Sequence, residues 1–248
     1  MAQLTHLNPY RRLLLGLTGL LALSPMWGHA QANWPSKPIH FIVPFSAGGA
    51  NDLMGRAAAE GASKVLWQTV VVDNRPGAGG SLGASIVAKS APDGYTFLIS
   101  AAGTISNPMI KASSPYKDED LLPVALIALA PSMVVVPHHA KYQNLKDFVE
   151  ASKASQGFNF ATAGSGSTPH FVAEILNVKY GAKLQPVPYK SGSESTTAVM
   201  GGQVEGTSEA SIIALPHILH DGKFKALATT WTQRLSAYPQ LATATEQG

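Results

Sequence analysis

The chain has 248 residues, of which 45% are hydrophobic, and a formal net charge of +3. It contains no cysteine, which excludes disulfides, thiolate nucleophiles and cysteine-ligated zinc. Two of its basic residues lie among the first 32 residues, which hold no acidic residue, so the remainder carries 16 basic and 15 acidic residues. A nearly neutral chain of this kind is a poor partner for nucleic acid or an acidic membrane surface.

The first 32 residues have the pattern of a secretory signal peptide. Arg11 and Arg12 precede an apolar run, residues 13–23, that is well short of the roughly 20 residues needed to span a bilayer. Ala30 and Ala32 form the small-x-small pattern of a cleavage site. We therefore expect export and cleavage near Ala32. A short membrane anchor and a twin-arginine signal are the alternatives.

Beyond this leader, β-branched runs alternate with helical patterns, which predicts an α/β fold around a mainly parallel sheet. A helix is predicted over residues 52–66, where apolar residues fall on one face. Asn144 is predicted to cap a second helix, and Thr168 followed by Pro169 a third. Gly222 is predicted to end a helix that begins near Pro216. The predicted strands are residues 38–43, 69–72, 95–100, 124–129, 133–136, 158–162, 184–187, 204–208 and 225–229.

The segment 121–137 breaks this alternation. Two strand candidates, residues 124–129 and 133–136, follow one another with no helix between them. We interpret the segment as a crossover between two lobes, because the chain beyond residue 32 is long enough for two small α/β lobes.

Two strand-to-helix turns, residues 44–50 and 74–81, consist mainly of glycine and other small residues. Such turns present backbone N–H groups at a helix N-terminus, where the helix dipole also favours an anion. No nucleophile–base pair stands out elsewhere in the sequence, so we expect the protein to hold a small anion. The predicted contacts in the first turn are Phe45, Ser46, Ala47, Gly48 and Gly49.

Three further groups follow predicted strands and are expected at the same sheet edge, because ligands of open α/β sheets bind at the carboxyl ends of strands. The turn after strand 95–100 forms one wall, and the turn 164–168 forms a second anion cradle. Glu209 is expected just beyond the strand 204–208, where it could meet an amine, a hydroxyl or a water. The predicted ligand contacts in these groups are Ser100, Gly103, Thr104, Ser165, Ser167, Thr168, His170 and Glu209.

Other site types are poorly supported. Residues 77–83 miss the dinucleotide pattern G-x-G-x-x-G, because Leu82 stands where glycine is required. His217 and His220 have helical spacing but no third ligand, so we predict no metal and no cofactor. The remaining enzymatic alternative is an exported hydrolase that uses Ser165 or Ser167 with His170, although no acid is evident to orient the histidine.

Several of these segments resemble signatures of the Bug family, the TctC-like extracytoplasmic receptors of tripartite tricarboxylate transporters. The first signature is residues 43–49 with Asp52 and Arg56. The others, in order, are residues 74–80, 91–96, 164–167 with His170, 187–190, 201–204, and Arg234 with Pro239, Glu246 and Gly248. The resemblance implies a type II periplasmic-binding-protein fold, in which two α/β lobes close on a ligand.

The resemblance also implies boundaries and a role. Residues 1–32 would be the signal peptide, 33–130 the first part of lobe one, 131–224 lobe two, and 225–248 a return to lobe one. The protein would be a monomeric periplasmic receptor, not an enzyme, that delivers a small carboxylate to transporter subunits in the membrane. The ligand classes implied are di- and tricarboxylates, acidic amino acids and aromatic carboxylates. A receptor that reports ligand to a two-component kinase is the alternative.

Three departures from the family pattern limit what can be transferred. The family usually has aspartate where Glu209 stands and glycine where Ser191 stands, so ligand size is not carried over. The family also continues beyond the position of Gly248 with a segment that completes lobe one. By that comparison, lobe one is expected to be truncated in this sequence.

Overall fold

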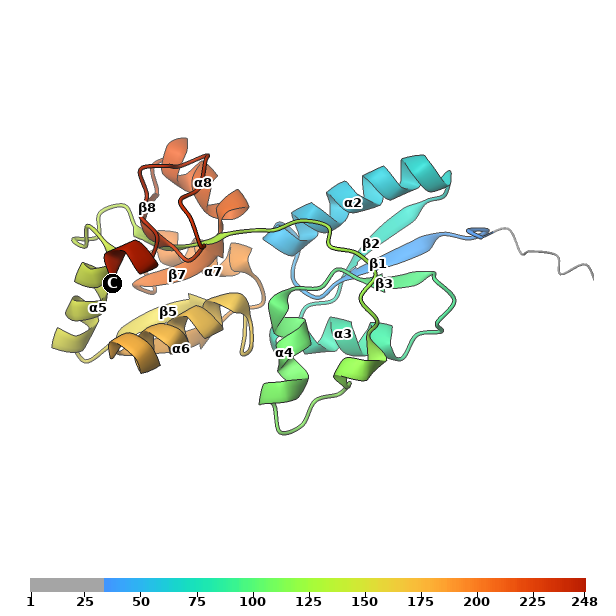
Figure 1. Ribbon diagram of the computed structural model, residues 1–248, viewed down its shortest axis with the longest axis horizontal. Coiled ribbons are helices and arrows are strands. Elements are labelled where there is room, and N and C mark those ends of the chain that lie inside the picture. The colour runs from blue at the N-terminus through green and yellow to red at the C-terminus, as the bar shows by residue number, and fades with distance from the viewer. Residues whose placement is uncertain (1–33) are drawn as a thin grey trace, which may run out of the picture. The chain divides into compact units, whose positions relative to one another are not determined.

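The computed structural model describes residues 34–248, and residues 37–248 form one unit that contains two separate β-sheets. The first sheet has three strands and the second has five (Figure 1). The predicted signal peptide lies outside the described residues. The α/β fold is confirmed by this arrangement of parallel strands joined through helices.

The first sheet is fully parallel and has the strand order β2-β1-β3. Helix α2 covers one face, and α3 and α4 lie on the other side of the sheet (Figure 1). Gly55 allows α2 to approach closely, because a Cβ there would lie 3.1 Å from the Val43 side chain. The elements are β1 (Ile39–Val43), α2 (Ala50–Leu66), β2 (Val70–Asn74), η2 (Ala78–Gly80), α3 (Ser81–Ala88), β3 (Thr96–Leu98), α4 (Ala102–Ile110) and η3 (Asp118–Asp120).

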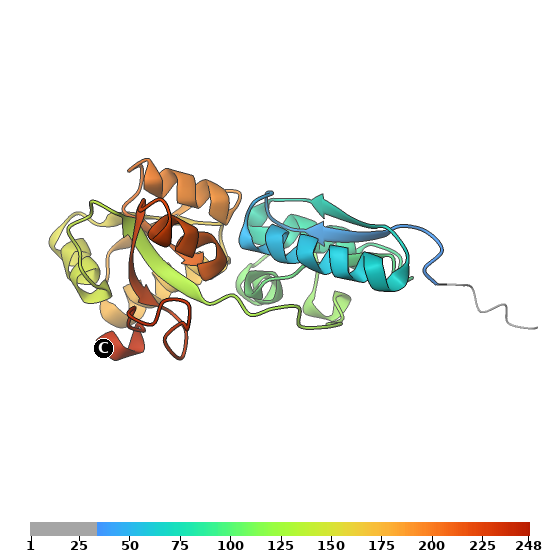
Figure 2. The same ribbon diagram turned by 90° about the horizontal axis from the view of Figure 1, so that it is seen from above.

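The second sheet has the order β6-β5-β7-β4-β8, and β4 runs antiparallel to both of its neighbours. The sheet lies among its four helices, which Figure 2 shows from above. Its elements are β4 (Ser132–Pro137), α5 (Leu145–Ala154), β5 (Phe158–Thr162), α6 (Thr168–Tyr180), β6 (Leu184–Pro188), α7 (Gly192–Met200), β7 (Gly206–Ala210), α8 (Ser211–Leu219) and β8 (Phe224–Thr229), with η4 (Thr245–Gln247) near the end of the chain.

Strand β4 contributes side chains to two apolar cores, one on each face of the second sheet. Val134 and Val136 join one core, and Met133 and Val135 join the other. All four side chains are completely buried, as expected for a strand covered on both faces. In the first core the Phe148 ring is also fully buried and meets three other aromatic rings with centroids 5.3 to 6.4 Å away.

The residues 124–129, predicted as a strand, are not one. Within residues 34–248 no strand pairs with this segment, so no β-ladder forms here. Its apolar side chains are exposed, with 76% of Leu126 and 75% of Val124 accessible to solvent. The β-branched and other apolar residues of the run favour a strand, but propensity alone does not make a strand without a pairing partner.

The predicted return to the first lobe at residue 225 is wrong, because β8 pairs with β4 in the second sheet. The buried side chains of Phe224 and Leu227 hold β8 in the two cores of that sheet. Further along, Thr243 bridges to Thr229, so this part of the chain stays beside β8. The remaining lobe boundaries stay predictions.

Smaller differences concern helix and strand ends. The side chain of Asn144 caps α5 as predicted, accepting a 2.8 Å hydrogen bond from the N–H of Asp147. Helix α6 is capped one residue earlier than predicted, at Ser167. The last helix spans Ser211–Leu219, so it begins before Pro216. Glu209 lies within β7 and not beyond its end.

Candidate functional site

The turn after β1 is organised by a buried carboxylate. Asp52 is 3% exposed and accepts hydrogen bonds from the Gly48 N–H (2.9 Å), from Asn74 (2.9 Å) and from Arg56 (3.0 Å). Burial opposes the ionisation of Asp52, but these donors outweigh it and lower its pKa. Asp52 and Arg56, which belong to the family signature in residues 43–56, therefore form a hydrogen-bond network that supports the turn. The Gly48 N–H is not free, because Asp52 already accepts it.

The same turn contacts the N-terminus of α7 in the second sheet's half of the molecule. Ser46 Oγ lies 3.5 Å from Glu194 Oε1, and Ser193 Oγ donates to the Ala47 carbonyl over 3.3 Å. Phe45 is buried, and its carbonyl accepts from Asn74. Four of the five residues predicted in this turn thus have defined partners, and Gly49 caps α2.

The α7 N-terminus was missed as a site by sequence reasoning. Ser191 caps the helix by accepting from the Glu194 N–H, and Glu194 accepts from the Lys190 N–H in return. Ser-x-x-Glu is the sequence pattern of a capping box, so residues 191–194 carried a readable helix-start signal. The family signature taken from the sequence ends at Lys190, and Ser191 was considered only as a departure from it, so the helix start was not used.

A second contact, made by Gly79 and Gly103 with the turn 164–168, involves almost no side chains. The backbone of Gly79 lies against the Ser165 carbonyl, and Gly103 lies against the Gly166 carbonyl, so closely that a Cβ on either glycine would clash. Asn107 from α4 donates to the Gly79 carbonyl over 3.0 Å. Gly79 also has φ +63°, which favours glycine. The predicted wall residue Gly103 and the predicted cradle 164–168 are therefore brought together.

Several predicted site hydroxyls are engaged locally. Thr104 is fully buried, and its hydroxyl bonds the Ser100 hydroxyl and the Ala101 carbonyl. Ser167 Oγ donates to the Gly164 carbonyl over 2.6 Å, and His170 Nδ1 accepts from the Gly166 N–H over 3.3 Å. These bonds shape the two turns. The hydroxyl of Ser167 and the ring of His170 are not bonded to each other, which is the contact a hydrolase would need.

Three predicted residues have other surroundings. Ser165 and Thr168 are exposed, so their side chains are accessible. Glu209 is 6% exposed, and its Oε1 accepts from the Ala210 N–H over 3.0 Å. Burial raises the pKa of Glu209 to about 7. Its carboxyl group abuts Gly192, the first residue of α7, where a Cβ would clash with it.

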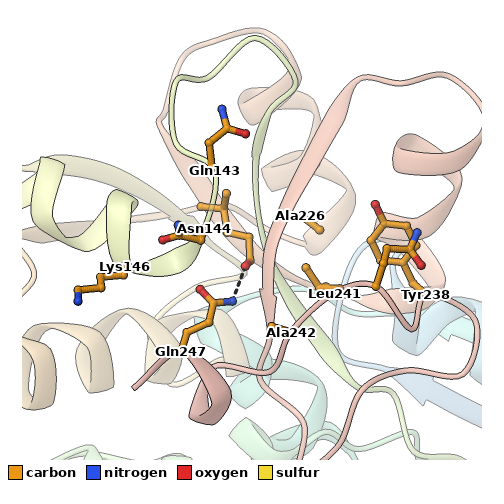
Figure 3. Close-up of a pocket in the computed structure, with 10 residues that line it drawn as sticks. Gln143, Asn144, Lys146, Ala226, Tyr238, Leu241, Ala242 and Gln247 are labelled. Atoms are coloured by element: carbon orange, nitrogen blue, oxygen red, sulfur yellow. Dashed lines mark hydrogen bonds between the residues drawn. The ribbon is translucent and has the colours of Figure 1, made fainter.

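A defined pocket lies elsewhere, between α5, β8 and the end of the chain (Figure 3). It has a volume of about 470 Å³, and Asn144, Tyr238 and Gln247 are among the residues that line it. Gln247 donates to the Leu227 carbonyl over 2.8 Å (Figure 3) and accepts from the Leu145 N–H. None of the predicted ligand contacts lines this pocket.

Two negative findings apply to residues 34–248. No group of three or more histidine and acidic side chains is placed to hold a metal ion. In the same residues, no helix has both the length and the apolar character required to cross a bilayer.

Solved structures with the same fold define the class of protein. The periplasmic binding protein BugD superposes with a TM-score of 0.82 at 31% identity, covering 87% of this chain and 72% of BugD. MatC from Rhodopseudomonas palustris, solved with malate, superposes with a TM-score of 0.82 at 28% identity, covering 87% of this chain and 74% of that one. A second R. palustris protein, solved with adipate, gives the same TM-score at 29% identity, with 87% and 73% covered. The fold is that of periplasmic solute-binding proteins.

The family model of the tripartite tricarboxylate transporter family receptor, TctC, matches residues 54–248. The protein BugT of Bordetella pertussis is 36% identical over 222 residues, which are 87% of this chain and 67% of BugT. The UPF0065 protein of the tcbD-tcbE intergenic region in Pseudomonas sp. strain P51 is 32% identical over 238 residues, covering 95% of this chain and 70% of that protein. The chain belongs to the TctC family of solute receptors, and the resemblance stated from its motifs is confirmed.

Proposed function

We propose that this protein is a periplasmic receptor that captures a small carboxylate for a tripartite tricarboxylate-type transporter. The observation that carries the proposal is the contact between the turn after β1 and the N-terminus of α7, through Ser46 with Glu194 and Ser193 with Ala47. Two helix N-termini, those of α2 and α7, contribute to this meeting. Helix N-termini favour anions, and relatives of this fold have been solved with malate and adipate.

The two sheets would then act as two lobes. One carboxylate would be held at the turn after β1 by backbone groups of Ser46, Ala47 and Gly49, since Asp52 already occupies the Gly48 N–H. The turn 164–168, His170 and Glu209 would face the other end of the ligand. Hinge closure around a ligand is a common motion of two-lobed binders, and the contacts of the turn after β1 with α7 would belong to the closed arrangement.

Calorimetry of the folded protein against a panel of mono-, di- and tricarboxylates, acidic amino acids and aromatic carboxylates tests the proposal. We expect saturable binding of at least one member. Ser46→Ala should weaken that binding about fivefold, because one hydrogen bond between the two halves is worth about 1 kcal/mol. Ser90→Ala is the matched control, since the Ser90 hydroxyl bonds only the Ile86 carbonyl within its own helix region. A panel with no binding at all would overturn the carboxylate proposal.

A sensory receptor for a two-component kinase would use the same ligand contacts and differ only in its membrane partner. Pull-down of candidate partners with and without the identified carboxylate would separate the two roles. The hydrolase alternative has less support, because Ser167 donates to the Gly164 carbonyl and not to His170. Ester turnover abolished by Ser167→Ala would revive it.

A further inference from the structure

The Glu209 carboxyl group is buried without the partners that a charged carboxylate requires. Only 6% of the Glu209 surface is exposed to solvent. Oε1 accepts a hydrogen bond from the Ala210 N–H, and within residues 34–248 Oε2 has no hydrogen-bond partner. A buried polar atom left unpaired costs free energy, so an unpaired carboxyl oxygen in a folded protein calls for an explanation.

The surroundings of Glu209 are helical on one side and apolar on the other. Its carboxyl group touches Gly192 at the start of α7, a helix of nine residues. Its register partner in β4 is Met133, which is completely buried. The glycine at 192 leaves the space that the carboxyl group fills, because any side chain there would displace it. The acid is therefore packed into the positive end of a helix dipole.

Among residues 34–248, no charged side chain compensates the carboxyl group of Glu209. Strand β7 packs against β4, β5, α6, α7 and α8, and neither β4 nor β5 carries a titratable side chain. In the two helices α7 and α8, the groups are Glu194, which is bonded to Ser46 and Lys190, and His217, which is bonded to Asp221. The titratable residues of α6 are His170, Glu174, Lys179 and Tyr180. None of them shifts the pKa of Glu209, which burial raises and only the Ala210 N–H opposes.

The hydrogen-bond pattern fits a neutral carboxylic acid. In such a group the carbonyl oxygen accepts and the hydroxyl oxygen donates. Oε1 already accepts from a backbone N–H, so Oε2 is the oxygen that would carry the proton. Its missing partner is then an acceptor. The positive end of α7 beside it favours the same kind of group, because an acceptor with negative charge is stabilised there.

We propose that Glu209 donates a hydrogen bond from Oε2 to a second acceptor group on the bound carboxylate, so that the receptor prefers dicarboxylates to monocarboxylates of the same length. This inference rests on the proposed function and specifies its ligand class. It assigns to Glu209 a role in specificity that depends on the proton it holds. Helix α7 connects the two proposed ends of the ligand site. It begins beside Glu209, and its residue Ser193 donates a hydrogen bond to the turn proposed to hold the first carboxylate.

Calorimetry with matched pairs of ligands tests this role. The probes are succinate with butyrate, glutarate with pentanoate and adipate with hexanoate, each measured at pH 6.5 and pH 8.5. For the wild type we expect the dicarboxylate that binds to lose more than about tenfold in affinity between these pH values, because the proton on Glu209 must be retained for binding. At pH 8.5 binding should take up about one proton, measured as the dependence of the heat on the ionisation enthalpy of the buffer.

Two variants provide the controls. Glu209→Gln keeps a donor and cannot ionise, so its dicarboxylate affinity should stay within a few-fold of the wild-type value at pH 6.5 and change little with pH. Titration of the ligand itself appears equally in this variant. Glu209→Leu keeps the volume and removes the donor, so the dicarboxylate preference should disappear while the monocarboxylate affinity remains.

The outcomes separate this inference from the proposed function. Dicarboxylate binding that shows the same pH dependence in the wild type and in Glu209→Gln, or that Glu209→Leu leaves unchanged, would overturn the role of Glu209 and leave carboxylate capture standing. Monocarboxylates bound as tightly as dicarboxylates at pH 6.5 would do the same. No binding of any pair, by a protein shown to be folded, would overturn both proposals.

Discussion

Asp52 and Glu209 are two buried carboxyl groups with opposite surroundings. Asp52 receives hydrogen bonds from a guanidinium, an amide and a backbone N–H, and its pKa is lowered. Glu209 receives one backbone N–H, and burial raises its pKa to about 7. The two residues lie in different halves of the chain, one beside the three-stranded sheet and one within the five-stranded sheet.

Asp52 is therefore a structural carboxylate, whereas Glu209 has a carboxyl oxygen without a hydrogen-bond partner within residues 34–248. The partners of Asp52 come from the turn itself, from α2 and from the end of β2, so the group fixes residues 44–50 against these two elements and has little left to offer a ligand. Glu209 has no such network and contributes an unfavourable free energy at neutral pH. Groups that weaken a fold without a structural return occur mainly at functional sites.

The largest effect is expected for Glu209→Gln at alkaline pH. The folded pKa of about 7 lies above 4.5, the ordinary pKa of a glutamate, so the folded state holds more protons than the unfolded state between these pH values. Stability therefore falls as pH rises from 4.5 to about 7 and then levels off. Each pH unit costs about 1.4 kcal/mol, so Glu209→Gln should be more stable than the wild type by about 3 kcal/mol at pH 8. Urea unfolding at pH 4.5 and pH 8 measures the difference, and equal stabilities at pH 8 would contradict it.

A smaller effect of opposite pH dependence is expected for Asp52→Asn. Because the folded pKa of Asp52 is lowered, its contribution to stability is present above 3.8, the ordinary pKa of an aspartate, and is lost as pH falls through the folded pKa. At pH 7 the variant should lose about 1 to 3 kcal/mol, since Arg56 and Asn74 lose a charged partner. Urea unfolding between pH 7 and pH 3 should show the two proteins converging in acid. A constant gap over this range would mean that charge is not the cause.

The smallest effect is expected for Arg56→Gln. The Arg56 side chain is 53% exposed and lies 3.0 Å from Asp52, so solvent screens much of the attraction. We expect a small loss of stability that shrinks in 1 M salt. Arg75→Gln is the matched control, because Arg75 is equally exposed and lies 3.4 Å from the half-exposed Asp73. A loss at Arg75 as large as that at Arg56 would show that the buried partner does not matter.

Local sequence patterns predicted most of the elements. The strand predicted at residues 158–162 has those bounds as β5, and Asn144 caps α5, because both depend on alternation or a cap that neighbouring residues determine. The pairing of β8 with β4 and the unpaired state of residues 124–129 depend on which segments meet in space. No local pattern contains that information, so both were predicted wrongly.

For the candidate site, the turns were found and their partners were not. The glycine-rich turns after β1 and β5 are readable from composition, but the occupation of the Gly48 N–H by Asp52 is a matter of three-dimensional packing. The contact of Ser193 with Ala47 joins residues 146 positions apart. Glu209 was singled out from its place near a strand end, whereas its burial and its unpaired oxygen required the fold.

Gly103 lies so close to the Gly166 carbonyl that a single added methyl group would force the two turns apart. Gly103 lies in α4 with no positive φ, so alanine there is compatible with the helix and would act only by filling the space against Gly166. Gly61, in α2, has no atom within 4 Å of its Cβ position and offers a helix glycine where the same change meets nothing. Comparing Gly103→Ala with Gly61→Ala would therefore show what the close approach of the two turns contributes, without changing any group that could bind a ligand.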